Sequence, residues 1–181
     1  MATPPDFVVG GILTAAQMNA VGLWKVGTVT AGPSAEILVN NVFNSDYANY
    51  RVIVSDLLIA STQAVRLQFR DAGGNIATGH QFGGWFINMT LAAGTGAFGN
   101  TAQSFMQVGF SDAVNKVNIS FDIYRPNISG QTGLTANGTD SGSANFMAGR
   151  QTETKTVTGF RLFGASGGSI SATIQIFGYR N

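Results

Sequence analysis

The 181-residue sequence contains no cysteine, so it can form no disulfide, thiolate metal site or iron–sulfur cluster, and it offers no cysteine nucleophile. The missing cysteines favour assembly in a reducing cytoplasm. Charged side chains are also scarce, at 10% of the chain, where about 25% is usual. With a net charge of +1, the sequence lacks the basic footprint of a protein that binds DNA or RNA.

Long apolar runs are absent as well. No stretch approaches the roughly 18 apolar residues that a membrane-spanning helix needs, so we expect no membrane partner. The N-terminus does not resemble a signal peptide, because Pro4, Pro5 and Asp6 occupy the place of a basic n-region. These features again favour a protein assembled in the cytoplasm.

The side chains that enzymes use are few. The only histidine is His80, no G-x-S-x-G elbow accompanies it, and we interpret it as a polar residue at the start of a strand. The nine acidic residues include no pair whose spacing indicates a glycosidase, although a depolymerase is an alternative. We therefore expect no catalytic residue, no cofactor and no enzyme activity.

Metal ligands are equally sparse. Asp71 with Asn75, and Asn137 with Asp140, could each contribute oxygens to a calcium site, but neither pair has the spacing of an EF-hand. Turns in which the side chain bonds to the nearby backbone explain these residues more simply. We expect no metal site, with calcium as the alternative.

Neutral residues are abundant instead. The chain has 24 glycines and 13 phenylalanines, together with many serines, threonines and asparagines. A surface covered by neutral polar residues suits sheets and subunit interfaces better than exposed helices. Low charge also removes repulsion between copies that are packed at high density, which favours a component of an assembly.

Residues 1–24 differ from the rest of the chain. Residues 13–22 are typical of one short helix, with Thr14 as N-cap, Gln17 in a capping box and Gly22 at the end. About two turns of helix are not stable alone, so this segment must dock on its own domain, a second copy or a larger partner. We predict an attachment or oligomerisation segment at 1–24 and a β-sandwich domain at 25–181.

From Trp24 onward, apolar residues recur at every second position. The alternation is clearest over residues 117–124, which Pro126 ends. Segments 90–100 and 126–143 are predicted to be long exposed loops, or loops ordered by a neighbouring subunit. The segments predicted to be strands are 26–30, 50–55, 65–70, 81–89, 103–110, 117–124, 143–151, 157–163 and 169–179.

About nine or ten strands with glycine- and asparagine-rich turns and no long helix between them predict an all-β fold. We expect an antiparallel, jelly-roll-like β-sandwich with a short N-terminal extension that carries one short helix. Four aromatic residues cluster along one segment: Phe82, Trp85, Phe86 and Phe98. We interpret them as residues that pack in the core or in a trimer interface, and the alternative is that they stack on a glycan.

Three stretches resemble structural proteins of tailed bacteriophages. Residues 6–19 (DFVVGGILTAAQMN) are similar to the N-terminal segments of tail-fibre and other appendage proteins. Residues 42–54 (VFNSDYANYRVIV) resemble a strand of small β-sandwich virion proteins, and residues 174–181 (IQIFGYRN) resemble their final strand. Because the stretches lie at both ends, the resemblance covers most of the chain.

The resemblance implies a non-catalytic protein on the virion surface, assembled in the host cytoplasm as a homotrimer with a jelly-roll-like head. Its partners would be further copies and a major capsid, tail or neck protein. The small size and the lack of an extended shaft fit a capsid decoration, cement or head-fibre protein. The alternatives are a tail-fibre knob that recognises a host surface glycan and a cellular lectin unrelated to phages.

The resemblance also implies roles for individual residues. The candidate anchor or trimer contacts are Phe7, Leu13, Met18 and Trp24. Tyr47, Tyr50 and Arg51 would be structural, as a corner followed by the start of a strand. Whether residues 1–24 bind the particle or the trimer is left open.

Overall fold

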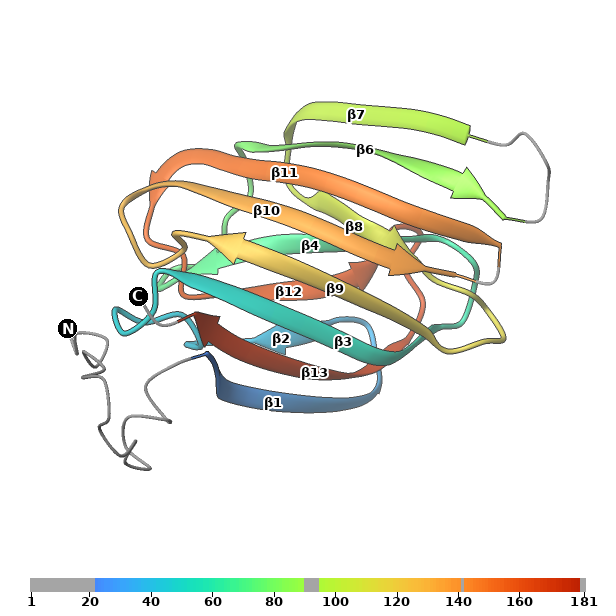
Figure 1. Ribbon diagram of the computed structural model, residues 1–181, viewed down its shortest axis with the longest axis horizontal. Helices are drawn as coiled ribbons and strands as arrows, with labels where there is room; N and C mark the ends of the chain where they lie inside the picture. The colour runs from blue at the N-terminus through green and yellow to red at the C-terminus, as the bar shows by residue number, and fades with distance from the viewer. Residues whose placement is uncertain (1–21, 90–94, 141, 180–181) are drawn as a thin grey trace, which may run out of the picture.

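Residues that alternate between polar and apolar form the strands of two antiparallel sheets, which pack face to face in the computed structural model (Figure 1). The structure describes residues 22–89, 95–140 and 142–179. These residues contain no helix, and so none that could cross a membrane. The predicted all-β antiparallel sandwich is confirmed, whereas the short helix predicted over residues 13–22 lies outside the described residues except for Gly22.

The strands follow one another along the chain with short connections. In order they are β1 (Leu23–Ser34), β2 (Ile37–Val39), β3 (Asn49–Ile59), β4 (Ala64–Asp71), β5 (Gly74–Asn75), β6 (His80–Asn88), β7 (Thr95–Gln103), β8 (Met106–Phe110), β9 (Val117–Tyr124), β10 (Gly130–Thr139), β11 (Ser143–Lys155), β12 (Gly159–Gly164) and β13 (Ile170–Tyr179). β1 begins at Leu23, so Trp24 belongs to the sandwich rather than to the segment that precedes it.

Eight of these strands form a jelly roll. They are β1, β2, β3, β4, β8, β9, β12 and β13. The pairing runs from the outermost strands in sequence to the innermost: β1 pairs with β13, β2 with β12, β3 with β9 and β4 with β8. This is the pairing of a long hairpin rolled up into two sheets. One sheet contains β1-β13-β3-β9, and the other contains β2-β12-β4 with β8 and β5 on the remaining edge of β4.

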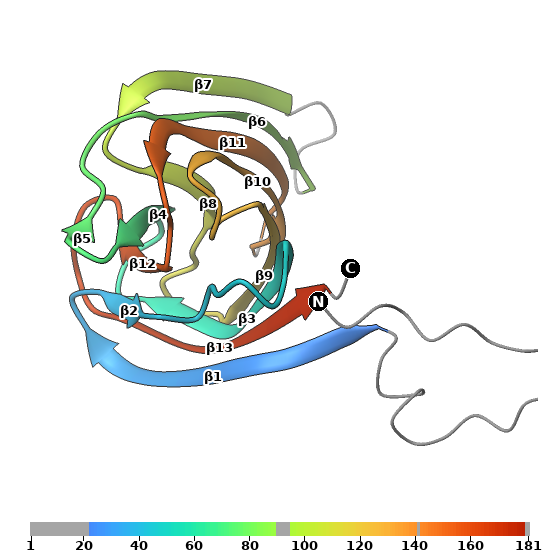
Figure 2. The ribbon, with the colours of Figure 1, turned by 90° about the vertical axis from the view of Figure 1, so that its left-hand side faces the viewer.

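Two hairpins are inserted into the roll, and both enlarge the same sheet. The β6-β7 hairpin follows β5, the β10-β11 hairpin follows β9, and β11 pairs with β6. The larger sheet therefore has eight strands, in the order β1-β13-β3-β9-β10-β11-β6-β7. Figure 2 shows this sheet curving around the smaller one, with β1 and β7 at its two edges.

The core fills the space between the sheets. Every second residue of β13 from Ile170 to Ile176 is buried, and Tyr50, Val52 and Val54 of β3 are buried beside them. Each large apolar side chain that is buried in this way contributes about 1.5–3 kcal/mol. Successive residues of a strand point to opposite sides, so the apolar residues of the alternating pattern face the core and the polar residues face the solvent.

A tyrosine corner leads into β3. The hydroxyl of Tyr50 donates a hydrogen bond to the Asn44 carbonyl (3.0 Å) and accepts one from the Asn44 amide (2.8 Å), which closes the loop over the core. The ring of Tyr47 packs edge-on against Tyr50, with centroids 5.8 Å apart. Glycine is needed at position 178 because a Cβ there would overlap the Tyr47 ring. The stretch over residues 42–54 is therefore a structural corner.

The structure contradicts the two predicted loops. Segment 90–100 contains the first part of β7, and segment 126–143 contains β10. Both strands are rich in glycine, alanine, threonine and asparagine, so their alternation carries little contrast in hydrophobicity. β7 is a strand because it pairs with β6, and β10 is a strand because it pairs with β9 and β11. These pairings leave little trace in the local sequence.

The edges of the two sheets are protected unequally. β1 carries Lys25, Pro33 and two irregularities in its pairing, all of which hinder further strand addition. β2 is only three residues long. By contrast, the nine residues of β7 include no charged residue and no proline, and residues 95–100 pair with β6 without a bulge. β7 is thus an unprotected edge among the described strands.

Candidate functional site

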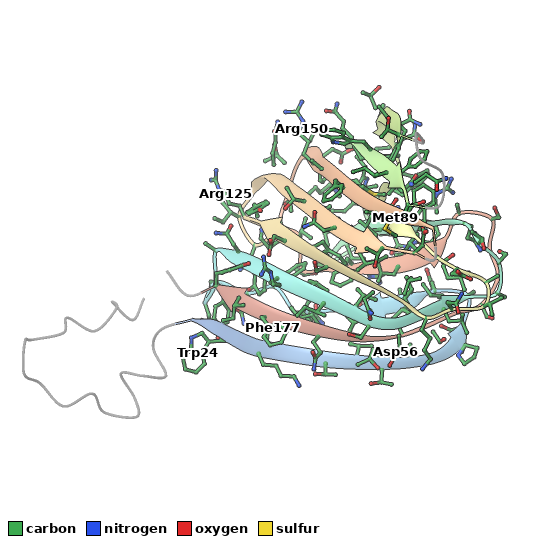
Figure 3. The ribbon with its side chains drawn as sticks, turned by 45° about the vertical axis from the view of Figure 1, so that its right-hand side comes forward. Trp24, Asp56, Met89, Arg125, Arg150 and Phe177 are labelled. Carbon is green, nitrogen blue, oxygen red and sulfur yellow. The ribbon has the colours of Figure 1, made fainter. Side chains whose placement is uncertain are left out.

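The outer face of the larger sheet is almost uncharged where the inserted strands lie. Three of these strands, β6, β7 and β10, have no charged side chain. The part of β11 that pairs with β6, residues 143–151, has one, Arg150. Figure 3 shows Arg125 and Arg150 toward one end of this sheet and Met89 toward the other. The middle of the face presents glycine, alanine, threonine and asparagine.

Two exposed aromatic rings interrupt this neutral surface. Trp85 of β6 is 64% exposed and Phe146 of β11 is 45% exposed. The two residues are directly paired across the strands, so their side chains leave the sheet side by side. Trp85 and Phe146 are named the aromatic platform below. Ile87 and Met89 extend the exposed apolar strip toward the end of β6.

A shallow trough lies against the aromatic platform. It has a volume of about 540 Å³ and is lined by Trp85, Phe146, Gly83, Ala97, Thr135 and Asn137 among others. Two further troughs adjoin it and share lining residues with it, one of about 310 Å³ through Asn137 and Phe146 and one of about 540 Å³ through Gly83. Together they form an elongated depression across the inserted strands.

The aromatic residues singled out in the sequence do not share one face. Trp85 points outward, whereas Phe82, Phe86 and Phe98 are half-buried on the inner side of the β6-β7 hairpin. There Phe82 packs against Phe98, and Phe98 and Phe86 each pack against Phe110, all with ring centroids 6.3 Å apart. The strand period of two separates Trp85 from its neighbours in sequence.

Phe146 was missed by sequence reasoning. Its position in β11, between the buried Asn145 and Met147, marks it as an outward residue once the strand is recognised. Its partnership with Trp85 depends on the register between β11 and β6, which are about sixty residues apart along the chain. An apolar residue on the polar face of a strand is the one local signal that the sequence offered.

The candidate anchor residues lie mostly beyond the described part of the chain. Phe7, Leu13 and Met18 fall outside the described residues. Trp24 is half-buried in β1, where it pairs with Gly178 of β13. Trp24 and the aromatic platform therefore lie toward opposite edges of the larger sheet.

A charged cluster ties together three neighbouring strands on the same outer face. Arg51 of β3 donates two hydrogen bonds to Asp122 of β9 (2.9 and 2.8 Å), and the Tyr179 hydroxyl of β13 donates a third (2.7 Å). Burial acts to raise the pKa of Asp122, but the bonds from Arg51 and Tyr179 outweigh it and hold the pKa below its ordinary value. Burial and the bond to Asp122 raise the pKa of Tyr179 to about 12. The carboxylate is thus fully engaged and serves to fasten the strands.

His80 is completely buried and does not face the troughs. Its Nε2 accepts a hydrogen bond from the Phe69 amide (3.3 Å), and its ring stacks on that of Phe69. Burial lowers its pKa to about 4, so the imidazole is neutral at pH 7. A base in this position is out of reach of any substrate on the surface.

The two aspartates considered for calcium form turns, whereas Asn137 lies within β10 and lines the trough. The Asp71 carboxylate accepts a hydrogen bond from the Gly73 amide (2.8 Å), and the Asp140 carboxylate accepts bonds from the amides of Gly142 (2.8 Å) and Ser143 (2.7 Å). Within the described ranges no group of three or more histidine, aspartate or glutamate side chains could hold a metal ion.

The outer face of the inserted strands combines exposed rings with neutral polar groups. It offers two aromatic rings, neutral donors and acceptors, and an elongated depression, while the described acids near it are paired or form turns. No family model, no curated protein and no solved structure matches this chain. The inference of function therefore rests on the sequence resemblance, the fold and the surface.

Proposed function

We propose that the protein is a non-catalytic structural protein on the surface of a tailed-phage particle, where it acts as a homotrimeric capsid decoration, cement or head-fibre protein. Three sequence stretches, over residues 6–19, 42–54 and 174–181, support this proposal through their resemblance to such proteins. The jelly roll is compatible with it, because viral capsid proteins use this fold, as do many lectins. A fold alone does not imply a function, so the surface has to carry the rest.

The unprotected edge strand β7 is the observation that supports contact between copies, whereas the number of copies in the proposal comes from the sequence resemblance. Residues 95–100 present a row of backbone amides and carbonyls with no lysine, proline or bulge to block another chain. Proteins that act as monomers protect such edges, as β1 and β2 of this chain are protected. The low charge of the chain supports close packing between copies as well.

The direct test is cryo-electron microscopy of the intact particle, with this chain located in the map. We expect trimers across the capsid surface, with residues 1–24 lying on the shell. Density only at the tail or neck would replace the capsid role with that of a fibre or knob. Absence of the chain from the particle would reject the proposal.

The oligomeric state gives a second test that needs only the purified chain. We expect a mass of three times the 18.9 kDa of one chain by native mass spectrometry. Ala97→Lys places a charge in the unprotected part of β7 and should shift the mass toward one chain. Thr30→Lys, on the protected edge strand β1, is the matched control and should leave the mass unchanged. A wild-type protein that is a monomer at all concentrations would contradict self-association.

A further inference from the structure

The aromatic platform exposes rings that contribute nothing to the core. Its two residues lie on the outer face of the sheet, and Trp85 is the more exposed of the pair at 64%. Apolar surface exposed to water is unfavourable. Single exposed apolar residues are common, but two paired aromatic rings beside Ile87 and Met89 form a patch, and such patches mark binding sites.

Small residues keep the faces of these rings open. Gly83 and Ala97 flank Trp85 along and across the strands, and Ala148 stands two residues beyond Phe146 on β11. These small residues line the trough, and the adjoining troughs lengthen it. The shape suits a chain of several linked rings better than a single small molecule.

The polar groups along the trough are neutral. Thr135 and Asn137 line it beside the aromatic platform, and Ser120 lines the adjoining trough. Hydroxyl and amide groups of this kind both donate and accept hydrogen bonds. Among the described residues that line the three troughs, Arg150 at one end is the one charged side chain. The site therefore lacks the cluster of cations that an acidic ligand would need.

We propose that this trough binds a neutral glycan. The partially positive C–H groups on one face of a pyranose ring would stack on the electron-rich faces of Trp85 and Phe146. The sugar hydroxyls would exchange hydrogen bonds with Thr135 and Asn137. This activity goes beyond particle attachment and does not depend on it, because it belongs to the isolated chain.

A second copy of the chain is the other occupant that an exposed aromatic pair could have. The core of an interface between proteins is a contiguous, closely packed apolar patch. Here the rings of Trp85 and Phe146 stand beside small residues and beside hydroxyl and amide groups. Every sugar unit of a glycan has a C–H face that can stack on a ring and hydroxyl groups that can form hydrogen bonds. This mixture of ring faces and neutral polar groups therefore matches a glycan better than a second copy of the chain.

The test is affinity electrophoresis of the full chain in native gels that contain dextran, galactomannan or hydroxyethylcellulose, with polygalacturonate as the acidic comparison. An array of neutral bacterial oligosaccharides widens the range of probes. We expect at least one neutral glycan to bind the wild-type chain, and we expect Trp85→Ala and Phe146→Ala to weaken this binding about tenfold or more. Ala148→Arg should have the same effect with both rings intact, because it fills the trough.

Leu23→Ala is the matched control, since Leu23 is an exposed apolar residue at the opposite edge of the same sheet and outside the troughs, and it should bind as the wild type does. Three results would overturn the proposal: no binding to any neutral probe, binding to polygalacturonate alone, or binding that Trp85→Ala leaves unchanged. A Trp85→Ala variant that loses self-association, in a protein that binds no glycan, would assign the face to contacts between copies. None of these results bears on where the chain lies on the particle.

Discussion

Burial of His80 should make the sandwich lose stability in mild acid. The pKa of His80 is about 4 in the folded chain and 6.5 for an ordinary histidine. Between these values the unfolded chain binds a proton that the folded chain does not, so stability falls as the pH falls from 6.5 toward 4. A difference of about 2.5 pH units corresponds to roughly 3 kcal/mol, which is a large part of the stability of a domain. Below pH 4 this residue adds no further loss.

The measurement is urea unfolding, followed by tryptophan fluorescence, at several pH values from 7 to 4. We expect the free energy of unfolding of the wild type to fall by about 3 kcal/mol over this range. His80→Gln keeps an oxygen that can accept a hydrogen bond from the Phe69 amide. Its free energy of unfolding should be lower than that of the wild type at pH 7 but should fall much less toward pH 4. Equal pH dependence in the two proteins would refute the reasoning, because the titrating group would then lie elsewhere.

Three further substitutions test other parts of the fold by the same unfolding assay. Asp122→Asn should cost about 1–2 kcal/mol at pH 7. Because the folded pKa of Asp122 is lowered, this contribution is present above pH 4 and is lost as the pH falls below it, so wild type and variant should converge in strong acid. Tyr50→Phe removes both hydrogen bonds to Asn44 and should cost about 1–2 kcal/mol without change in fold. Gly159→Ala should cost more than either, since its Cβ would overlap the Val39 carbonyl where β12 meets β2, and an unchanged midpoint would contradict that close approach.

Much of the fold could be predicted from the sequence, because strands with strong alternation identify themselves. Val117 to Tyr124 was predicted with the bounds that the structure has, and β4 and β13 were predicted to within a residue or two. The jelly roll was predicted from the number of strands and the turns between them, and the pairing bears it out. β7 and β10 could not be predicted, since alternation between glycine and alanine or threonine has too little contrast to reveal a period.

The candidate site was less accessible to sequence reasoning than the fold. Residues 82–98 were correctly seen as rich in aromatic side chains, but nearness along the chain is misleading in a strand, where neighbours face opposite ways. Trp85 alone of the four reaches the outer face, and its partner Phe146 comes from a strand whose register with β6 no local pattern encodes. Surface sites on sheets are formed across strands, so they depend on pairings that become known only with the fold.

The place of β13 in the larger sheet has a consequence for how the chain is made. β13 is inserted between β1 and β3, which precede it by more than a hundred positions and have no other means of joining. During synthesis β3 can pair with β9, whereas β1 must wait for β13, which is its one partner in the sheet among the described strands. Contacts so distant along the chain are slow to form, and a waiting strand is prone to wrong pairing. We expect the yield of folded protein to be limited by this delay, and to rise when translation is followed by folding at low temperature or beside a chaperone.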